Sequence, residues 1–131
     1  MVGAVPCGAK TMISPTGQGI RVDSEGDGNY GTSRGERRHN GIDYLCDPGQ
    51  GVVAPFDMIL ERESFPNPDQ EMTGIAWRKG KSTGRMWYFK PYKRLIGKLV
   101  YEGEEIGIAQ DVSGYYGLPN MNPHIHFQVK K

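Results

Sequence analysis

Short apolar or alternating runs, separated by turn residues, make up most of this chain. Seven segments have the length and composition of β-strands: residues 41–45, 51–56, 58–62, 73–78, 85–90, 98–109 and 124–129. The segments between them, such as CDPGQG and FPNPDQ, consist largely of turn-forming residues. The longest stretch without Gly or Pro, residues 56–65, groups its aliphatic residues together rather than at helical spacing. This pattern predicts an all-β fold with long loops and little or no helix.

The number and spacing of these strands also predict the architecture. Several short strands at such intervals are typical of an antiparallel β-sandwich or a partly open barrel. A chain of 131 residues is long enough for one hydrophobic core, so residues 1–131 are expected to form a single domain. Residues 1–38 are rich in Gly and polar side chains, which indicates a segment that wraps the sheet, with residues 1–27 as an N-terminal arm.

Charge and hydropathy exclude several classes of protein. Sixteen Lys and Arg against fifteen Asp and Glu give a formal net charge of +1, so the overall basicity that drives nucleic-acid binding is absent. No apolar run reaches the roughly 18 residues of a membrane span. The first ten residues, MVGAVPCGAK, lack the features of a secretory signal, so we expect either a cytosolic protein or the mature form of a secreted one.

The two cysteines, Cys7 and Cys46, bear on that choice. They lack the C-x-x-C spacing of thiolate metal sites and redox pairs. A disulfide between them would close a loop of about 40 residues, stabilise the fold by roughly 3–4 kcal/mol and indicate an extracellular protein. Two unrelated buried thiols are the alternative.

Two of the three histidines lie in the last segment of the chain, PHIHFQVKK. Side chains alternate along an extended strand, so His124 and His126 are expected on one face. The opposite face then carries the apolar side chains Ile125, Phe127 and Val129, which predicts that it packs against the core. A single histidine on a strand is usually a hydrogen-bonded structural residue, but two on one face favour a shared site.

The third histidine, His39, precedes Asp43 by four residues in RRHNGIDYL. An H-x-x-x-D pair by itself is a weak signal, because such pairs occur often by chance. Together with the distant H-x-H motif, it supplies imidazole nitrogens and a carboxylate oxygen, a ligand set that suits zinc. Three protein ligands leave a fourth position for water, so the residues predict an open zinc site.

These separated motifs resemble those of the lysostaphin-type zinc metallopeptidases. The resemblance rests on H-x-x-x-D, GVVAPF, YEGEEIG and the final H-x-H in that order, and it extends over about residues 28–129. It implies the lysostaphin-type fold, with His39, Asp43 and His126 as zinc ligands. It also implies that His124 is the general base beside a metal-bound water.

One position departs from the peptidase pattern. The peptidases carry a further catalytic histidine in a segment of the form Tyr-x-His-Leu, and Lys90 stands at that position in MWYFKPYKR. Losing one such group commonly costs about 2.7–4 kcal/mol of transition-state stabilisation. The resemblance therefore implies a peptidase fold that has lost its activity, in which His124 is a vestigial base.

Two segments, RRHNGIDYLCDPGQGVVAPFDMIL and YFKPYK, resemble the leukocyte cell-derived chemotaxin 2 family. Its members are secreted animal proteins on the same fold that keep the zinc ligands and lack peptidase activity. The resemblance implies a disulfide between Cys7 and Cys46. The family's other disulfide positions lack cysteines in this sequence, so receptor contacts cannot be transferred residue by residue.

Residues 78–98, RKGKSTGRMWYFKPYKRLIGK, form a basic segment without Asp or Glu. Its candidate anion-binding side chains are Arg78, Lys79, Lys81, Arg85, Lys93, Arg94 and Lys98. One interpretation is a solvated strand face balanced in space by Glu61, Glu63, Glu102, Glu104 and Glu105. The other is a basic, aromatic surface for anionic glycans or an acidic receptor patch, with single-stranded nucleic acid the weaker candidate.

Two functions follow from these expectations. The first is a secreted, zinc-stabilised, non-catalytic signalling protein that binds a cell-surface receptor or an anionic glycan, as a monomer or weak oligomer. The second is a zinc endopeptidase acting on glycine-containing peptides or bacterial cell-wall cross-bridges, with Lys90 replacing the missing histidine. The sequence favours the first, because of Lys90 and the chemotaxin-like segments.

Overall fold

The computed structural model describes residues 12–23, 26–27, 33–34, 37–38 and 41–130. Their strands are β1 (Val22–Asp23), β2 (Gly26–Asp27), β3 (Ser33–Arg34), β4 (Arg37–Arg38), β5 (Ile42–Leu45), β6 (Gly51–Val53), β7 (Met58–Ser64), β8 (Gly74–Lys79), β9 (Ser82–Trp87), β10 (Phe89–Pro91), β11 (Leu99–Val100), β12 (Glu105–Ala109) and β13 (His124–Lys130). Their helices are the 3-10 helix η1 (Lys93–Leu95) and the α-helix α1 (Val112–Tyr116). Cys7 and His39 lie outside the described residues.

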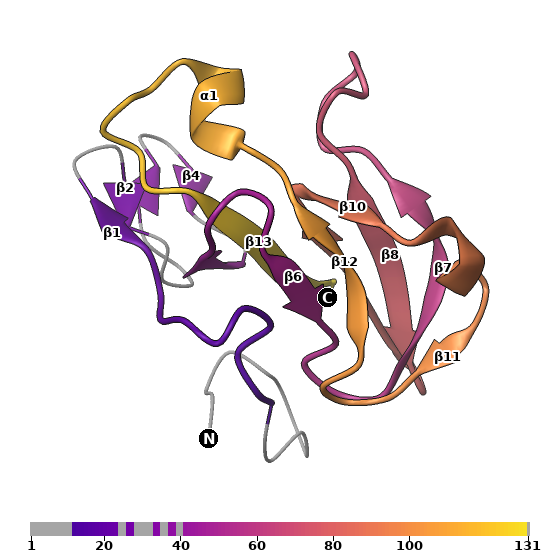
Figure 1. Cartoon of the computed structure of the whole chain (residues 1–131). Coiled ribbons are helices and arrows are strands. Elements are labelled where there is room, and N and C mark those ends of the chain that lie inside the picture. The colour runs from indigo at the N-terminus through magenta and orange to yellow at the C-terminus, as the bar shows by residue number, and fades with distance from the viewer. Residues whose placement is uncertain (1–11, 24–25, 28–32, 35–36, 39–40, 131) are drawn as a thin grey trace.

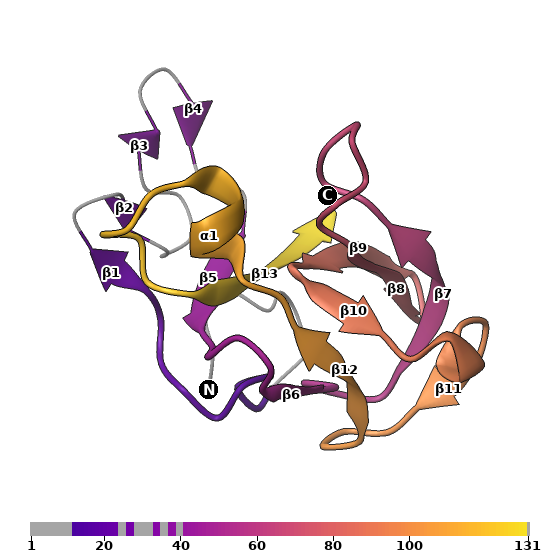
Figure 2. The ribbon, with the colours of Figure 1, turned by 45° about the horizontal axis from the view of Figure 1, so that its top comes forward.

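Two antiparallel sheets make up the body of the fold (Figure 1). The larger sheet has the strand order β11-β7-β8-β9-β13-β5, and the smaller has the order β10-β12-β6. Two-stranded ribbons, β1–β2 and β3–β4, lie beyond the β5 side of the larger sheet (Figure 2). Neither sheet closes into a barrel, so the expected all-β fold is confirmed in an open, two-sheet form.

One hydrophobic core joins the two sheets. In the larger sheet, the Phe127 ring stacks on Trp77 with centroids 5.5 Å apart, and Phe56 meets both rings edge-on. The smaller sheet adds Val52, Phe89 and Ile106 to the same cluster. Gly84 makes room for this packing, because a Cβ there would lie 2.6 Å from the Trp77 ring. The alternation predicted for the last strand is confirmed, since its apolar face packs into this core.

The expected strands agree with the structure except that the strand expected at 51–56 ends at Val53 and that two others are broken where the chain bends sharply. Residues 85–90 belong to two different sheets, because the backbone turns at Tyr88, which has a φ of 82°. The expected strand 98–109 is interrupted near Gly103, which has a φ of 84°. The helices are short, as expected, and none of those in the described part of the chain is long and apolar enough to cross a membrane.

The described part of the N-terminal arm runs along the sheet edges. The backbone N–H of Ile13 donates to the Pro55 carbonyl at 3.1 Å, and that of Val53 donates to Pro15 at 2.9 Å. Further along, the N–H of Arg21 donates to the carbonyl of Asp43 at 2.8 Å. These bonds fix residues 12–21 against β6 and β5, and they bring Arg21 beside a predicted zinc ligand.

Candidate metal centre

The predicted site residues of the two motifs meet across neighbouring strands. β13 pairs with β5 on one side and with β9 on the other. In this register His126 lies directly opposite Asp43 of β5 and opposite Trp87 of β9. Directly opposed residues of adjacent strands point to the same face, so the three side chains share the face of the sheet opposite the core.

His126 is held by contacts on both ring nitrogens. Nδ1 lies 2.9 Å from Oδ1 of Asp43, and Nε2 lies 2.7 Å from Oε1 of Gln128. The Trp87 indole stacks on the imidazole with centroids 5.5 Å apart. Gly41 allows this approach, because a Cβ there would lie 2.6 Å from the His126 ring. The ring is therefore fixed in place before any ligand binds.

Arg21 holds the other oxygen of the Asp43 carboxylate. Its Nη1 lies 3.0 Å from Oδ2, and both side chains are almost completely buried. An ionised carboxylate is tolerated in such a place only with a charged partner and hydrogen bonds. The ion pair therefore supplies a partner for Oδ2 of Asp43 and leaves Oδ1 directed at His126.

His124 occupies the next position on the same face and presents one nitrogen to Asp43. Its Nδ1 lies 2.8 Å from the carbonyl oxygen of Asn122, and its Nε2 lies 3.8 Å from Oδ2 of Asp43. Burial lowers the pKa of His124 below its ordinary value, although the Asp43 carboxylate acts in the opposite direction. A neutral ring that donates from Nδ1 exposes a lone pair on Nε2, the form required of a general base or a metal ligand.

Tyr88 forms the aromatic wall beside His124. The two rings meet edge-on with centroids 5.6 Å apart, and the Tyr88 hydroxyl lies 3.1 Å from that of Tyr116. Tyr88 has a positive φ of 82°, which is strained for a residue with a side chain. The same bend that moves the chain from β9 to β10 thus turns the Tyr88 ring toward the site.

The arrangement fits part of a zinc site. The carboxylate Oδ1 of Asp43 and the imidazole of His126 are adjacent and buried, and both are donor types that zinc accepts. Among the described residues, no group of three His, Cys, Asp or Glu side chains is placed to hold a metal ion. The third predicted ligand, His39, lies outside those residues. The donor pair is therefore compatible with zinc, and the full ligand set stays a prediction.

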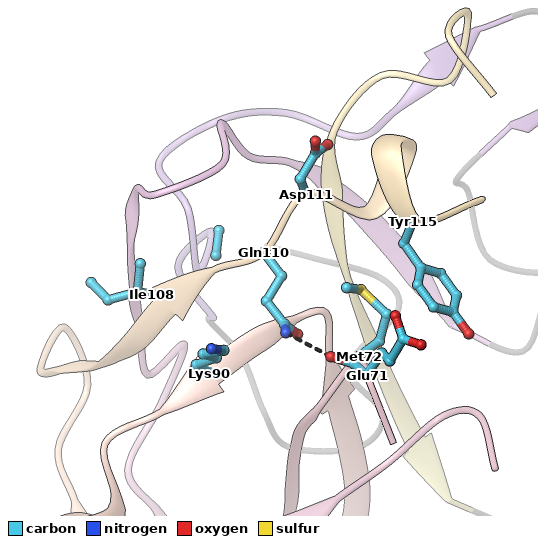
Figure 3. A pocket seen from close by; sticks show the side chains of 8 residues that line it. Glu71, Met72, Lys90, Ile108, Gln110, Asp111 and Tyr115 are labelled. Atoms are coloured by element: carbon cyan, nitrogen blue, oxygen red, sulfur yellow. Dashed lines mark hydrogen bonds between the residues drawn. The ribbon is translucent and has the colours of Figure 1, made fainter. Parts of the chain in front are cut away.

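Lys90 lies in the smaller sheet, on β10, opposite Ile108. Its side chain lines a surface cavity of about 540 Å³ together with Glu71, Gln110, Asp111 and Tyr115 (Figure 3). His124 and His126 are not among the residues that line this cavity. The residue in ring contact with His124 is instead Tyr88, two positions earlier in the chain.

Cys46 follows β5 directly and is buried. It forms no disulfide with any described residue, and Cys7 is not one of these. Burial, assisted by the nearby Asp47 carboxylate, raises the pKa of the Cys46 thiol to about 12. A thiol with a pKa raised this far is a poor nucleophile at neutral pH.

The basic segment 78–98 is distributed over the β8–β9 hairpin, β10 and η1. Arg78 pairs with Glu61 at 2.6 Å, and Lys93 lies 3.6 Å from Glu63. Two other cations lie over aromatic rings: Lys79 over Phe56 and Arg94 over Tyr92. The segment therefore includes both balanced cations and cations for which no carboxylate partner is seen in the described part of the chain.

The known proteins that are similar to this chain include two that match it over most of its length. Leukocyte cell-derived chemotaxin-2 of Bos taurus is 31% identical over 110 residues, which cover 81% of this chain and 69% of the relative. The same protein of Mus musculus is 31% identical over 125 residues, which cover 92% of this chain and 79% of the relative. The chain belongs to the leukocyte cell-derived chemotaxin-2 family. No protein-family model matches it.

Membership of the chemotaxin-2 family confirms the second resemblance found in the sequence and supports a chemotaxin-like factor. The lysostaphin-type fold stays a prediction. Sequence reasoning did not identify Arg21 or Gln128 as site residues, and it assigned Trp87 and Tyr88 only to a basic, aromatic surface. Gln128 lies two positions from His126 on β13, so strand alternation places it on the same face. Arg21, Trp87 and Tyr88 carry no such local signal, because they reach the site through the N-terminal arm, strand pairing and a backbone bend.

Proposed function

We propose that this protein is a secreted, zinc-binding, non-catalytic chemotaxin-like factor that acts through a cell-surface receptor or an anionic glycan. The single observation that carries the proposal is the buried Asp43–His126 contact at 2.9 Å, in a chain that belongs to the chemotaxin-2 family. The family relationship supports the chemotaxin-like role. The buried donor pair supports the metal.

The residues that would hold zinc are His39, Asp43 and His126. Zinc bound by such a set polarises a carbonyl group or lowers the pKa of a bound water. In a non-catalytic protein its contribution is structural, since the energy of binding becomes energy of folding. Asp43 and His126 lie on adjacent strands, at the edge of the larger sheet, so the metal would fasten β5 to β13.

The proposal that the protein is non-catalytic is supported by the surroundings of His124. A peptidase needs a donor for the oxyanion close to its general base. Among the described residues, neither a hydrogen bond nor an ion pair joins Lys90 to His124, and the Lys90 side chain lines a cavity to which His124 does not contribute. Two observations favour the second candidate, a zinc endopeptidase. The pKa of His124 is lowered by burial, and its Nε2 lies 3.8 Å from Oδ2 of Asp43.

A turnover assay separates these two functions. We expect the zinc-loaded protein to leave oligoglycine peptides and purified peptidoglycan uncut, as judged by mass spectrometry of the products after prolonged incubation. His124→Ala is the matched control, because it removes the candidate base and retains all three predicted ligands. Cleavage by the wild-type protein that is absent in His124→Ala would establish the endopeptidase and refute the non-catalytic role.

We also propose that Cys46 forms a disulfide with Cys7, which would tie the N-terminal arm to the end of β5. The proposal is supported by the family relationship and by the burial of Cys46. We expect a free-thiol assay on the oxidised protein, unfolded in denaturant, to find close to no thiol, while the protein reduced beforehand shows both cysteines. Two thiols in the oxidised sample would contradict the disulfide and the extracellular setting it implies.

A further inference from the structure

The outer face of the larger sheet, meaning the face of β7, β8, β9 and β13 that carries Trp87 and His126, has an excess of positive charge. Four cationic side chains of these strands lie on this face, those of Arg62, Arg78, Arg85 and Lys130, whereas Lys79 lies over the core ring of Phe56 on the other face. The acidic residues of the four strands are Glu61 and Glu63, and both already pair with cations. The near-neutral charge of the whole chain thus conceals a local positive surface.

Strand register places two of these cations in one row. Arg62 of β7 lies opposite Ala76 of β8, Ala76 lies opposite Arg85 of β9, and Arg85 lies opposite Gln128 of β13. Neighbouring strands are about 4.8 Å apart, so the Cα atoms of the two arginines are separated by roughly 10 Å. Ala76 lies between them and is only 2% exposed, so the surface of the row is formed by the longer side chains on either side of it.

Both guanidinium groups retain donors for an anion. Nη1 of Arg62 donates to the Glu63 carbonyl at 3.3 Å, and Nη1 of Arg85 donates to the Gly84 carbonyl at 3.1 Å. A guanidinium has five N–H donors, so each keeps most of them after these bonds. Neither group has a carboxylate partner among the described residues, in contrast to Arg78 and Lys93. Arg62 is exposed and Arg85 is half-buried at the surface.

We infer that this row, Arg62, Arg85 and Gln128, binds a linear sulfated glycan that lies across the strands. The geometry favours a polyanion with regularly spaced charges, because two guanidinium groups about 10 Å apart match separate anionic groups on one chain. An extended polymer also fits an open sheet face better than a single phosphate does. This row would be the glycan-binding surface of the proposed function. Glycan binding here rests on the proposed function only in requiring that the protein is extracellular, and it does not require zinc.

Single-stranded nucleic acid is the less favoured polyanion on this face. Proteins that bind it combine basic side chains with aromatic rings on which successive bases stack. Trp87 lies two positions after Arg85 on β9, and one face of its ring is already stacked on His126. The outer face therefore supplies charge and hydrogen-bond donors rather than a stacking platform.

The test compares two double variants that each remove two positive charges. Arg62→Ala/Arg85→Ala removes both cations of the row, while Lys93→Ala/Arg94→Ala removes the two cations of η1. Affinity for a size-defined heparin oligosaccharide is measured by calorimetry at physiological salt, and thermal melting confirms that all proteins are folded. We expect the first variant to bind roughly 25-fold more weakly than wild type, about a factor of five for each arginine, and the second to bind almost as wild type does.

Three results would overturn the inference: no binding by the wild-type protein, an equal loss in both double variants, or equally tight binding of a single-stranded oligonucleotide of similar charge. Zinc content measured on the same samples keeps this test separate from that of the metal. Zinc without glycan binding refutes only the glycan surface, and glycan binding without zinc refutes only the metal.

Discussion

His39→Ala, Asp43→Asn and His126→Ala are each expected to abolish the stabilisation that zinc gives to the fold, while His124→Ala retains it. The physical reason is that only the first three remove a predicted ligand. Zinc at a free concentration about a thousandfold above its Kd stabilises the native state by about 4 kcal/mol, and this term vanishes when the metal no longer binds. The loss is among the largest that we expect from single substitutions in this chain.

The measurement is the difference in melting temperature between zinc-loaded and chelator-treated protein, taken for each variant. Each substitution also breaks contacts that do not involve zinc, such as the stacking of His126 on Trp87. Taking the difference within each variant removes the effect of those contacts on the melting temperature. We expect a clear positive difference for the wild type and His124→Ala, and a difference near zero for the three ligand variants. If His126→Ala showed the same difference as the wild type, the metal would not be bound where we propose.

Arg21→Met is the second substitution with a large expected effect. It leaves the buried Asp43 carboxylate without the guanidinium that lies 3.0 Å away. Breaking a buried ion pair by removing one partner costs about 3–5 kcal/mol, because a charge is left uncompensated in a medium of low polarity. We expect urea denaturation to show a loss of this size in the free energy of unfolding.

Two further variants identify the cause of that loss. Arg21→Lys keeps the charge and should recover part of the stability, although an ammonium group cannot reproduce the geometry of a guanidinium. Arg21→Met/Asp43→Asn removes both charges, so it should be more stable than the sum of the two single losses predicts. Strict additivity of the two substitutions would show that Arg21 contributes through its packing rather than through Asp43.

The sequence predicted those parts of the fold that depend on local periodicity. The alternation in HIHFQV placed Phe127 in the core and both histidines on the opposite face, and the structure has this arrangement. The short helix α1 was not predicted, although Asp111 accepts a hydrogen bond from the Gly114 N–H at its start and Gly117 ends it with a φ of 68°. These capping signals lie in a segment so rich in Gly and Pro that a turn was the simpler interpretation.

The candidate site depends on non-local contacts that no sequence pattern carries. Trp87 reaches His126 because β9 and β13 pair in one register, and a shift of a single residue would turn the indole to the core. Arg21 reaches Asp43 because the N-terminal arm runs beside β5. The role of Tyr88 depends on a strained backbone conformation. Each follows from the assembled sheet, so the sequence indicated the candidate ligands but not the residues that surround them.

The most direct test of the central claim is the zinc content of the purified protein, measured by elemental analysis. Wild type and His124→Ala, prepared without chelator, should each contain about one zinc per chain, while Asp43→Asn and His126→Ala prepared in parallel should contain almost none. Absence of zinc from the wild type after dialysis against the metal, or an equal zinc content in all four proteins, would contradict the account.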